Sequence, residues 1–482
     1  MAHLGCSPES CGRWSSEGPV VKPEIEGLRV LNFSAVRTDK FGPEVCDVNV
    51  YLTHGANDTV RIQTLLPLDG SYNGRFRAVG GGGLEVGWFE DRLAANIEDG
   101  YVVTATDGGL IPEADWSIPS VAQQLLVNFA YLSIHEMTLV GKALAEQLYG
   151  GPVSYSYFTA CSNGGRQGLM AAQKYPEDYT GVLAVAPVAD WPRWSPASMW
   201  ANLVQVREDN FLDVCVWDSI TARAIETCDA DDGGEDGIIG DPLDCEFDAS
   251  SMLGETVCDN VVITETIAKI WNDVTAGPTK PDGSSAWFGF PPGSNLTNLA
   301  SKDFWWDATW WTINFVEQFE DFDESTIPAG DLHIYIEKSS QLYGELFMTD
   351  EIDLNPFRKA GGKLLSWHGL ADETVPPQIA IQYRERALAA VDYEDDNDQE
   401  DGAGNDFFRF FAAPGVRHCR GGQGAVPTRD LQQLVEWVEE GKAPERLEAS
   451  GVVGDRELCL WPGKLTYAGQ GDLADASSWT CQ

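Results

Sequence analysis

The chain has 482 residues, of which 43% are hydrophobic and 22% are charged, the proportions of a globular protein with a sizeable core. Its 75 acidic residues outnumber 32 basic ones, and the formal net charge of −43 makes nucleic acid and anionic membranes poor partners. No apolar run reaches the roughly 18 residues that a membrane-spanning helix requires, so a membrane protein is not expected.

The cysteines and glycosylation sequons indicate an oxidising compartment. The sequence holds 11 cysteines, none in a spacing typical of zinc fingers, and sequons at Asn32, Asn57 and Asn295. We therefore expect a secreted protein with several disulfides. The N-terminus has no basic segment followed by an apolar one, so a signal peptide is either trimmed from this sequence or never existed. The acidic excess fits an acidic secreted enzyme or a protein from a salty habitat, and composition does not distinguish them.

The N-terminal part is predicted to consist of strands and turns. Alternating apolar residues predict strands over residues 47–52, 59–65 and 75–79, and the last strand runs into four glycines, Gly80 to Gly83. A glycine run after a strand is typical of a tight loop. In an esterase, a loop at this place supplies a backbone N–H to the oxyanion hole.

The next elements lead to the most informative stretch of the chain. A strand over residues 101–106, a helix over 127–149 and a strand over 154–158 predict a parallel sheet flanked by helices. The stretch Ala160-Cys-Ser162-Asn-Gly164 follows. It is similar to the nucleophile elbow, Gly-x-Ser-x-Gly, in which a sharp turn presents a serine between small residues. A turn without a catalytic role is the alternative.

The sequence changes character in residues 191–350, where 10 of the 17 tryptophans fall and no alternation of strands and helices is evident. We predict that this segment is a lid domain inserted into an α/β-hydrolase catalytic domain formed by residues 1–190 and 351–482. The tryptophan pairs at 305–306 and 310–311 either pack the lid or form an aromatic wall for a substrate.

The sheet is predicted to resume in the C-terminal part. Strands are expected over residues 362–367 and 407–411, and helices over 378–390 and 428–440. The acidic segment 392–406 is typical of a solvated loop.

Three residues in this framework have the order of a catalytic triad. Ser162, Asp372 and His418 each follow a predicted strand, in the Ser, Asp, His order of α/β-hydrolases. In such a triad the histidine deprotonates the serine, and the aspartate orients the histidine. His368 is the rival base because it also ends a strand, but it precedes Asp372 and breaks the order.

Two cysteines strengthen this assignment. Cys161 directly precedes Ser162 and Cys419 directly follows His418, so the thiols can pair if both loops meet at one site. Chain entropy gives a disulfide across so long a loop a stabilisation on the order of 5 kcal/mol. Its larger effect would be to align nucleophile and base, because a misplacement near 1 Å can lower the rate about 100-fold.

Together these residues resemble the tannase and feruloyl esterase family. The resemblance is carried by Cys161-Ser162, Asp372 and His418-Cys419, with support from residues 73–76, 80–83 and 228–238. It implies an α/β-hydrolase fold, a lid that selects the substrate and a bound calcium ion, without an organic cofactor. The sequence departs from the family in a shortened N-terminal cap and in the acidity of residues 392–406.

The implied calcium site lies in a short acidic loop of the predicted lid. By similarity to the family, its ligands are the carboxylates of Asp229, Asp232 and Asp236 and the carbonyls of Gly234 and Ile238. Several oxygens on a glycine-containing loop suit a hard cation, although the spacing is not that of an EF-hand and a solvated acidic turn is the alternative. The further disulfides that we expect are Cys228–Cys245, Cys215–Cys258, Cys459–Cys481, and Cys46 with either Cys6 or Cys11.

The leading hypothesis is a secreted serine carboxylesterase that cleaves galloyl, feruloyl or other aromatic acyl esters. Its partner is expected to be a small aromatic ester, a plant polyphenol or a cell-wall ester. The backbone N–H of Asn163 and one from Gly82 or Gly83 are expected to bind the oxyanion. The alternative is a non-catalytic protein with the same fold and lid that binds aromatic or glycan ligands. A calcium-dependent adhesion module would explain residues 229–236 but not the elbow.

Overall fold

The computed structural model describes residues 11–12, 14, 28–55, 58–87, 91–94, 97, 99–110, 119–300, 303–304, 306–318, 321–347, 352–391 and 404–482. Predictions for Cys6, Asn57, Trp305 and most of the acidic segment 392–406 fall outside the described residues.

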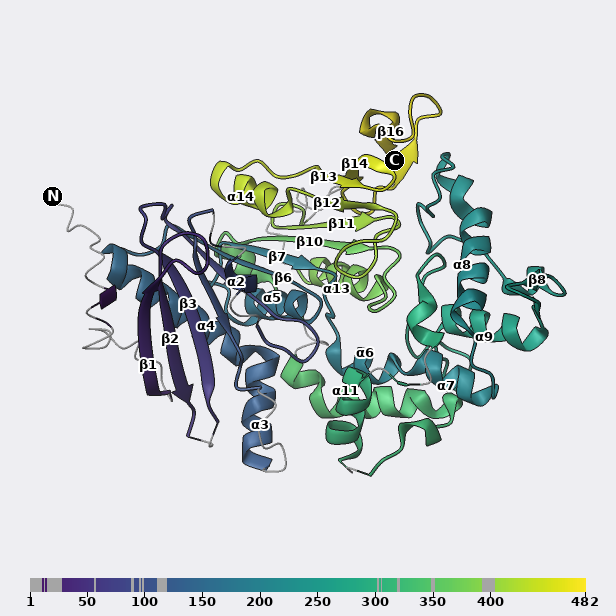
Figure 1. The fold of residues 1–482 in the computed structure, drawn as a ribbon, viewed down its shortest axis with the longest axis horizontal. Coiled ribbons are helices and arrows are strands. Elements are labelled where there is room, and N and C mark those ends of the chain that lie inside the picture. Colours follow the sequence, from purple (N-terminus) through teal and green to yellow (C-terminus); the bar gives the residue numbers. More distant parts are fainter. Residues whose placement is uncertain are drawn as a thin grey trace.

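Nine strands form one sheet in the order β1-β2-β3-β5-β4-β6-β7-β10-β11 (Figure 1). They are β1 (Arg29–Thr38), β2 (Val45–Thr53), β3 (Val60–Pro67), β4 (Arg75–Val79), β5 (Val102–Thr106), β6 (Tyr155–Cys161), β7 (Gly181–Val185), β10 (Lys363–Gly369) and β11 (Phe408–Ala413). Neighbouring strands are antiparallel from β1 to β5 and parallel from β5 to β11. The predicted strands of the N-terminal part are present as β2 to β6.

Helices cover both faces of the parallel strands. The helices packed on these strands include α4 (Ser133–Tyr149), α5 (Asn163–Lys174) and α14 (Asp430–Glu440). Successive strand residues alternate between two cores: Phe158 and Val182 pack in the cluster that contains residues of α4 and α5, whereas Tyr157 and Leu183 pack in the cluster that contains residues of α14. Every residue of β5 and β7 is buried, as expected for strands covered on both faces.

The segment between β7 and β10 is mainly helical and lies to one side of the sheet (Figure 1). Its helices include α6 (Trp191–Ala197), α7 (Trp200–Arg207), α8 (Val214–Cys228), α9 (Glu265–Ala276), α10 (Trp306–Trp311) and α11 (Leu332–Phe347). Part of it has an apolar core of its own, which includes Trp217 and Trp271. Trp191 and Trp311 belong instead to the main core, where their rings meet at 6.0 Å between centroids.

Two small sheets near the C-terminus were not expected from the sequence. One contains β12 (Ala425–Pro427), β13 (Arg446–Gly451) and β14 (Gly454–Cys459), and the other contains β15 (Leu465–Tyr467) and β16 (Trp479–Cys481). β12, β15 and β16 have three residues each, too few to show a period of two, whereas β13 alternates exposed and buried residues over 446–450 and could have been predicted. None of the helices in the described part of the chain combines the length and the apolar character that crossing a bilayer requires.

A buried ionic bridge joins the β2–β3 hairpin to α4. The His54 ring lies between two carboxylates, with Nδ1 2.5 Å from Asp58 Oδ2 and Nε2 2.9 Å from Glu136 Oε1. Burial alone would lower the pKa of His54, but the hydrogen bonds to Asp58 and Glu136 outweigh it and raise the pKa from 6.5 to about 9. The imidazolium therefore donates from both nitrogens at neutral pH.

This bridge predicts a pH-dependent contribution to stability. Because the pKa of His54 is higher in the folded than in the unfolded chain, the stabilisation is complete below about pH 6.5 and is lost as the pH rises through about 9. The shift corresponds to a stabilisation of about 3 kcal/mol. We expect His54→Asn to lower the thermal unfolding midpoint, followed by circular dichroism, more at pH 6 than at pH 10. An equal loss at both pH values would contradict the charged bridge.

Candidate active site

Ser162 lies in a strained turn between β6 and α5. Its φ of 66° and ψ of −128° are unusual for a residue other than glycine. Its N–H donates to Val185 O at 2.9 Å, and its carbonyl accepts from Arg166 N at 3.1 Å. Its side chain is partly exposed. The turn therefore has the geometry of a nucleophile elbow, as the sequence predicted.

The packing around this turn explains its small residues. A Cβ added at Gly164 would lie 2.4 Å from the Ala160 Cβ and 2.5 Å from Gly81 O. A Cβ at Gly165 would lie 2.6 Å from Val185 O. The alanine at position 160 is tolerated because the facing residue, Gly164, has no side chain.

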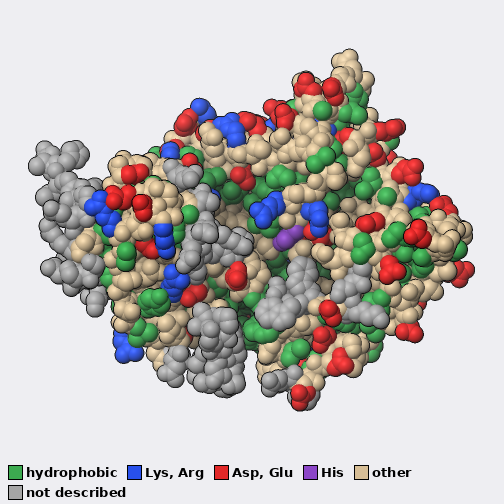
Figure 2. All heavy atoms as spheres, in the orientation of Figure 1, with side chains coloured by type: hydrophobic (Ala, Val, Ile, Leu, Met, Phe, Trp, Pro, Cys, Tyr) green, Lys and Arg blue, Asp and Glu red, His purple; other side chains and the backbone are tan. Residues whose placement is uncertain are grey.

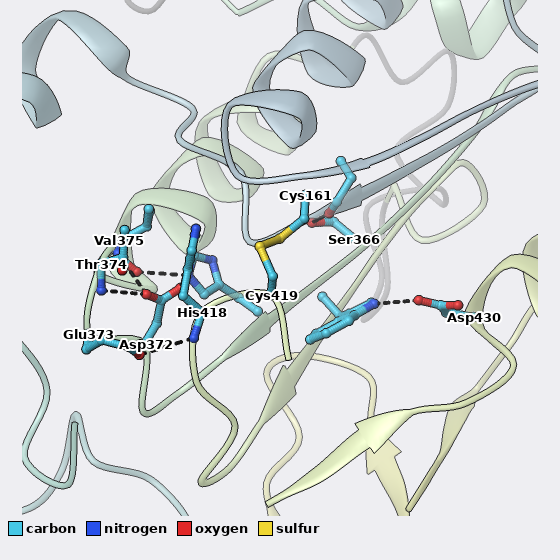
Figure 3. The surroundings of a disulfide bond; sticks show 12 residues. Cys161, Ser366, Asp372, Glu373, Thr374, Val375, His418, Cys419 and Asp430 are labelled. Atoms are coloured by element: carbon cyan, nitrogen blue, oxygen red, sulfur yellow. Dashed lines mark hydrogen bonds and ion pairs between the residues drawn. A yellow bond between two sulfur atoms is a disulfide. The ribbon is translucent and has the colours of Figure 1, made fainter. Parts of the chain in front are cut away.

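Asp372 and His418 meet at the ends of two adjacent strands. Asp372 follows β10, His418 follows β11, and Asp372 Oδ2 accepts a hydrogen bond from His418 Nδ1 at 2.7 Å (Figure 3). The Asp372 side chain is 0% exposed and that of His418 is 17% exposed. Nε2 of His418 is therefore the ring nitrogen left for a reacting group.

The electrostatics of this pair favour a charged histidine. Burial alone would raise the pKa of Asp372, but His418 and His368 outweigh it and hold that pKa well below its usual value. Burial alone would lower the pKa of His418, but the Asp372 carboxylate and, more weakly, Glu373 raise it above 6.5. The arrangement can accept a proton on His418 and stabilise the imidazolium that results.

Glu373 fixes the backbone of the histidine loop. One carboxylate oxygen accepts from the His418 N–H at 3.2 Å, and the other accepts from the Arg417 guanidinium at 2.7 Å. Glu373 directly follows Asp372, the proposed acid, and it binds the backbone of His418, the proposed base. Sequence analysis did not identify it, because nothing in the local pattern links Glu373 to a backbone N–H 45 residues away.

A disulfide joins the elbow to the histidine loop. Cys161 and Cys419 are 258 residues apart in the sequence, and their Cα atoms lie 5.9 Å apart (Figure 3). Their sulfur atoms lie within 4.8 Å of a ring nitrogen of His418. Both sulfurs are bonded to each other, so they are not available as thiolate ligands for a metal. Ser162 follows Cys161 and His418 precedes Cys419, so the bridge brings Ser162 and His418 to one site.

Ser162 is adjacent in sequence to one cysteine of this bridge, and His418 is adjacent to the other. In the described part of the chain, the Ser162 hydroxyl has no hydrogen bond to His418. Catalytic hydrogen bonds are often long in ligand-free enzymes and shorten in the substrate complex.

The glycine loop after β4 packs against the elbow. Gly81 N–H donates to the Gln167 amide oxygen at 3.2 Å, and Gln167 lies in α5. The Gly82 N–H is already bonded to Glu85 O at 3.0 Å, which leaves Gly83 as the better of the two glycines expected to bind an oxyanion. Asn163 is the first residue of α5, where backbone N–H groups have no partner within the helix.

Arg166 supports the elbow from inside the protein, which sequence analysis missed. Its guanidinium donates to Asn163 Oδ1 at 2.7 Å and to the carbonyls of Phe129 and Ala130 at 2.8 Å each. These carbonyls belong to the π-helical turn η1 (Asn128–Leu132). Burial lowers the pKa of Arg166 to about 9. The only sequence signal for this role was an arginine one helical turn after the serine. The carbonyls that it binds are 36 and 37 residues away, so the sequence could not identify them.

A cavity of about 350 Å³ lies between the predicted lid and the loops that lead to Asp372 and His418. Ile225, Ile239 and Asn295 line it from the predicted lid, and Leu370, Ala371 and Arg417 from the main domain. Its volume is within the range of small-molecule sites. Figure 2 shows one face of the molecule hollowed near its centre, with a histidine and basic side chains in the hollow.

The two tryptophans of the second pair, Trp310 and Trp311, both pack against Phe315. Trp311 is fully buried among Phe315, Tyr343 and Phe347, and its indole N–H donates to Ser339 Oγ at 2.9 Å. It is a packing residue. Trp305 and the side chain of Trp306 lie outside the described residues.

The acidic loop has features for and against a cation. Burial, with Asp236 and Asp229 nearby, raises the pKa of Asp232 to about 6, and Asp236 Oδ1 is buried without a partner. Asp229, however, accepts from the N–H groups of residues 236–238, and Asp236 Oδ2 accepts from Arg456 at 2.7 Å. The three carboxylates are not all within 4.8 Å of one another among the described residues. Their oxygen chemistry fits calcium, and the predicted ligands Gly234 and Ile238 belong to the same loop.

The other expected disulfides are present. The structure contains Cys215–Cys258, Cys228–Cys245 and Cys459–Cys481. Cys46 pairs with Cys11, which resolves the alternative that the sequence left open.

Comparison with known proteins gives one consistent result. The family model for tannase and feruloyl esterase matches residues 46–482. A probable feruloyl esterase of Arthroderma benhamiae is 37% identical over 95% of this chain and 92% of its own length. Among solved structures, tannin acyl hydrolase from Aspergillus niger has a TM-score of 0.86 at 22% identity, covering 100% of this chain and 95% of its own. Feruloyl esterase B from Aspergillus oryzae has a TM-score of 0.81 at 24% identity, covering 95% and 97%. These structures confirm the mixed α/β fold expected from the sequence.

Proposed function

The chain belongs to the tannase and feruloyl esterase family and is a carboxylic ester hydrolase acting on aromatic esters, and we propose that Ser162, Asp372 and His418 perform the reaction. The observation that carries this proposal is the 2.7 Å hydrogen bond from His418 Nδ1 to Asp372, on a loop that a disulfide joins to the residue before Ser162. It directs His418 Nε2 away from Asp372 and keeps it free for the serine.

The reaction then proceeds in two halves. Ser162 Oγ attacks the ester carbonyl while His418 Nε2 takes its proton, and Asp372 stabilises the imidazolium. The carbon–oxygen bond to the alcohol breaks as His418 returns the proton to the leaving oxygen. Water, deprotonated by His418, then attacks the acyl-enzyme, and the acid leaves as Ser162 regains its proton.

Backbone N–H groups are proposed to stabilise the negative charge of the tetrahedral intermediate. Asn163 N–H points from the start of α5, where the helix dipole favours an anion. Gly83 is the second proposed donor, since Gly82 is already hydrogen-bonded. Arg166 holds the Asn163 side chain by a 2.7 Å hydrogen bond and so fixes the first turn of the helix.

We infer a galloyl or hydroxycinnamoyl ester as the substrate. The names of the relatives include feruloyl esterases and a tannin acyl hydrolase, and the cavity beside the site has mostly apolar walls. Five disulfides support secretion, because such bonds persist in oxidising compartments. The non-catalytic alternative requires no such ordering of a serine, a histidine and a buried aspartate.

Ser162→Ala tests the nucleophile. We expect ester turnover to fall at least 1,000-fold, since removing a triad serine can cost on the order of a millionfold in kcat, with unchanged circular dichroism. A fluorophosphonate probe should label the wild type but not the variant. Methyl gallate, methyl ferulate and a short aliphatic ester, compared side by side, identify the acyl group. Full activity in Ser162→Ala would remove the assignment.

The disulfide between the elbow and the histidine loop predicts a second outcome. Replacing Cys161 and Cys419 together with serine removes the covalent alignment, so kcat should fall about 100-fold or more. The matched control is Cys215→Ser with Cys258→Ser, which removes a disulfide of the predicted lid. We expect the control to keep most of its kcat, and equal losses in the two variants would argue against an alignment role.

Calcium in the acidic loop is the third expectation. We propose that Asp229, Asp232, Asp236 and the carbonyls of Gly234 and Ile238 hold the ion, which would stabilise the loop. Saturating calcium should raise the thermal unfolding midpoint, with a stabilisation of about 2.7 kcal/mol at 100 times the dissociation constant. Asp232→Asn should abolish this rise, whereas Asp231→Asn, at a neighbouring exposed position outside the proposed ligand set, should keep it. A midpoint insensitive to calcium and chelator would remove the site.

A further inference from the structure

Asp372 is held by four hydrogen-bond donors, and one of them is a side chain outside the three-residue triad. Its Oδ1 accepts from the N–H groups of Thr374 and Val375 at 2.8 Å each. Its Oδ2 accepts from His418 Nδ1 at 2.7 Å (Figure 3). The same oxygen lies 3.0 Å from His368 Nε2. A second imidazole therefore contacts the carboxylate oxygen that orients the proposed base.

The neighbours of His368 determine where its proton lies. His368 Nε2 is also 2.9 Å from Val375 O, and a carbonyl oxygen can only accept. Nε2 therefore carries the proton and shares it between Val375 O and Asp372 Oδ2. Nδ1 is buried and has no partner among the described residues, so a proton there would be a donor without an acceptor. The tautomer with its proton on Nε2 is the one that these contacts favour.

The sheet fixes this donor more firmly than it fixes the acid. His368 lies within β10, in register with Ala412 of β11, and its side chain is 0% exposed. Asp372 lies four residues later, on the loop beyond the strand end. A donor held in the sheet can therefore set the direction of a carboxylate held on a loop.

We propose that His368 is a positioning residue for ester hydrolysis, whose Nε2–H keeps Asp372 Oδ2 directed at His418 Nδ1 and disperses the negative charge of that oxygen. His368 acts through Asp372 and does not touch the ester. The inference rests on the proposed function, in which Asp372 and His418 act as orienting acid and base. In support, His368 is one of the groups that lower the pKa of Asp372 against the effect of burial.

Two measurable effects follow from removing this donor. Asp372 gains freedom to rotate, which misaligns His418 and lowers kcat. Without the His368 donor, Asp372 Oδ2 carries more negative charge and stabilises the His418 imidazolium more strongly. The pKa of His418 therefore rises, and the acidic limb of the pH profile moves to higher pH. The titratable groups placed against this pair are Glu373, which contacts the His418 N–H, and Arg417, which is paired with Glu373.

The test compares His368→Gln, His368→Asn and His368→Phe. A glutamine amide can place its N–H near the position of Nε2, whereas asparagine is too short and phenylalanine has no donor. For Phe and Asn we expect kcat to fall about 10- to 100-fold, KM to change less than about threefold, and the acidic limb of kcat/KM to move upward by roughly half a pH unit. Gln should recover kcat to within about fivefold of the wild type and restore the limb.

Controls separate positioning from folding and from the proposed function. His135→Phe keeps a ring but removes a different His–Asp contact, of 2.8 Å from Nδ1 to Asp178, and should leave the pH profile unchanged. If Phe does not fold, the Gln and Asn pair still decides, because equal behaviour of these two variants overturns the inference. The inference is also overturned if both His368→Asn and His368→Phe keep the kcat and the acidic limb of the wild type. An active Ser162→Ala would instead overturn the proposed function, whatever the His368 variants do.

Discussion

The site depends on bringing together two loops that the sheet itself keeps apart. Cys161 ends β6, and Cys419 follows β11, with β7 and β10 between these strands. Three strand spacings amount to about 14 Å, yet the two Cα atoms are 5.9 Å apart. The histidine loop must therefore cross the ends of β10 and β7 to reach the elbow. The disulfide keeps it there, and the contacts of Glu373 and Asp372 with His418 fix its direction.

Buried charges near the site are satisfied mainly by neutral dipoles. Asp372 accepts from two backbone N–H groups besides its imidazole partners, and Arg166 donates to two carbonyls and an amide oxygen. Such hydrogen bonds are directional, so they fix orientation as well as compensate for lost hydration. His54 differs, because it joins two carboxylates as a cation and its effect is on stability.

The sequence was most informative where function leaves a local pattern. The contact of Asp372 with His418 and the disulfide beside Ser162 could be predicted because each of these three residues follows a strand, and Cys161 and Cys419 are adjacent in sequence to Ser162 and His418. Contacts between distant polar groups could not be predicted. Nothing near Arg166 identifies the carbonyls 36 and 37 residues away, and His54 gives no sign of Glu136. The sequence suggested His368 as a rival base, but in the structure it contacts Asp372. The order of residues along the chain cannot show such a contact.

The elbow has a wider consequence for how such turns are recognised. Ala160 and Gly164 face each other so closely that the space between them holds one methyl group. The dependence runs in one direction. Position 160 can hold a methyl group because Gly164 has none, whereas a side chain at 164 would also meet the backbone oxygen of Gly81 and is excluded whatever residue stands at 160. A pattern that demands glycine at both positions rejects this chain, whereas one that demands it only at the second position accepts it.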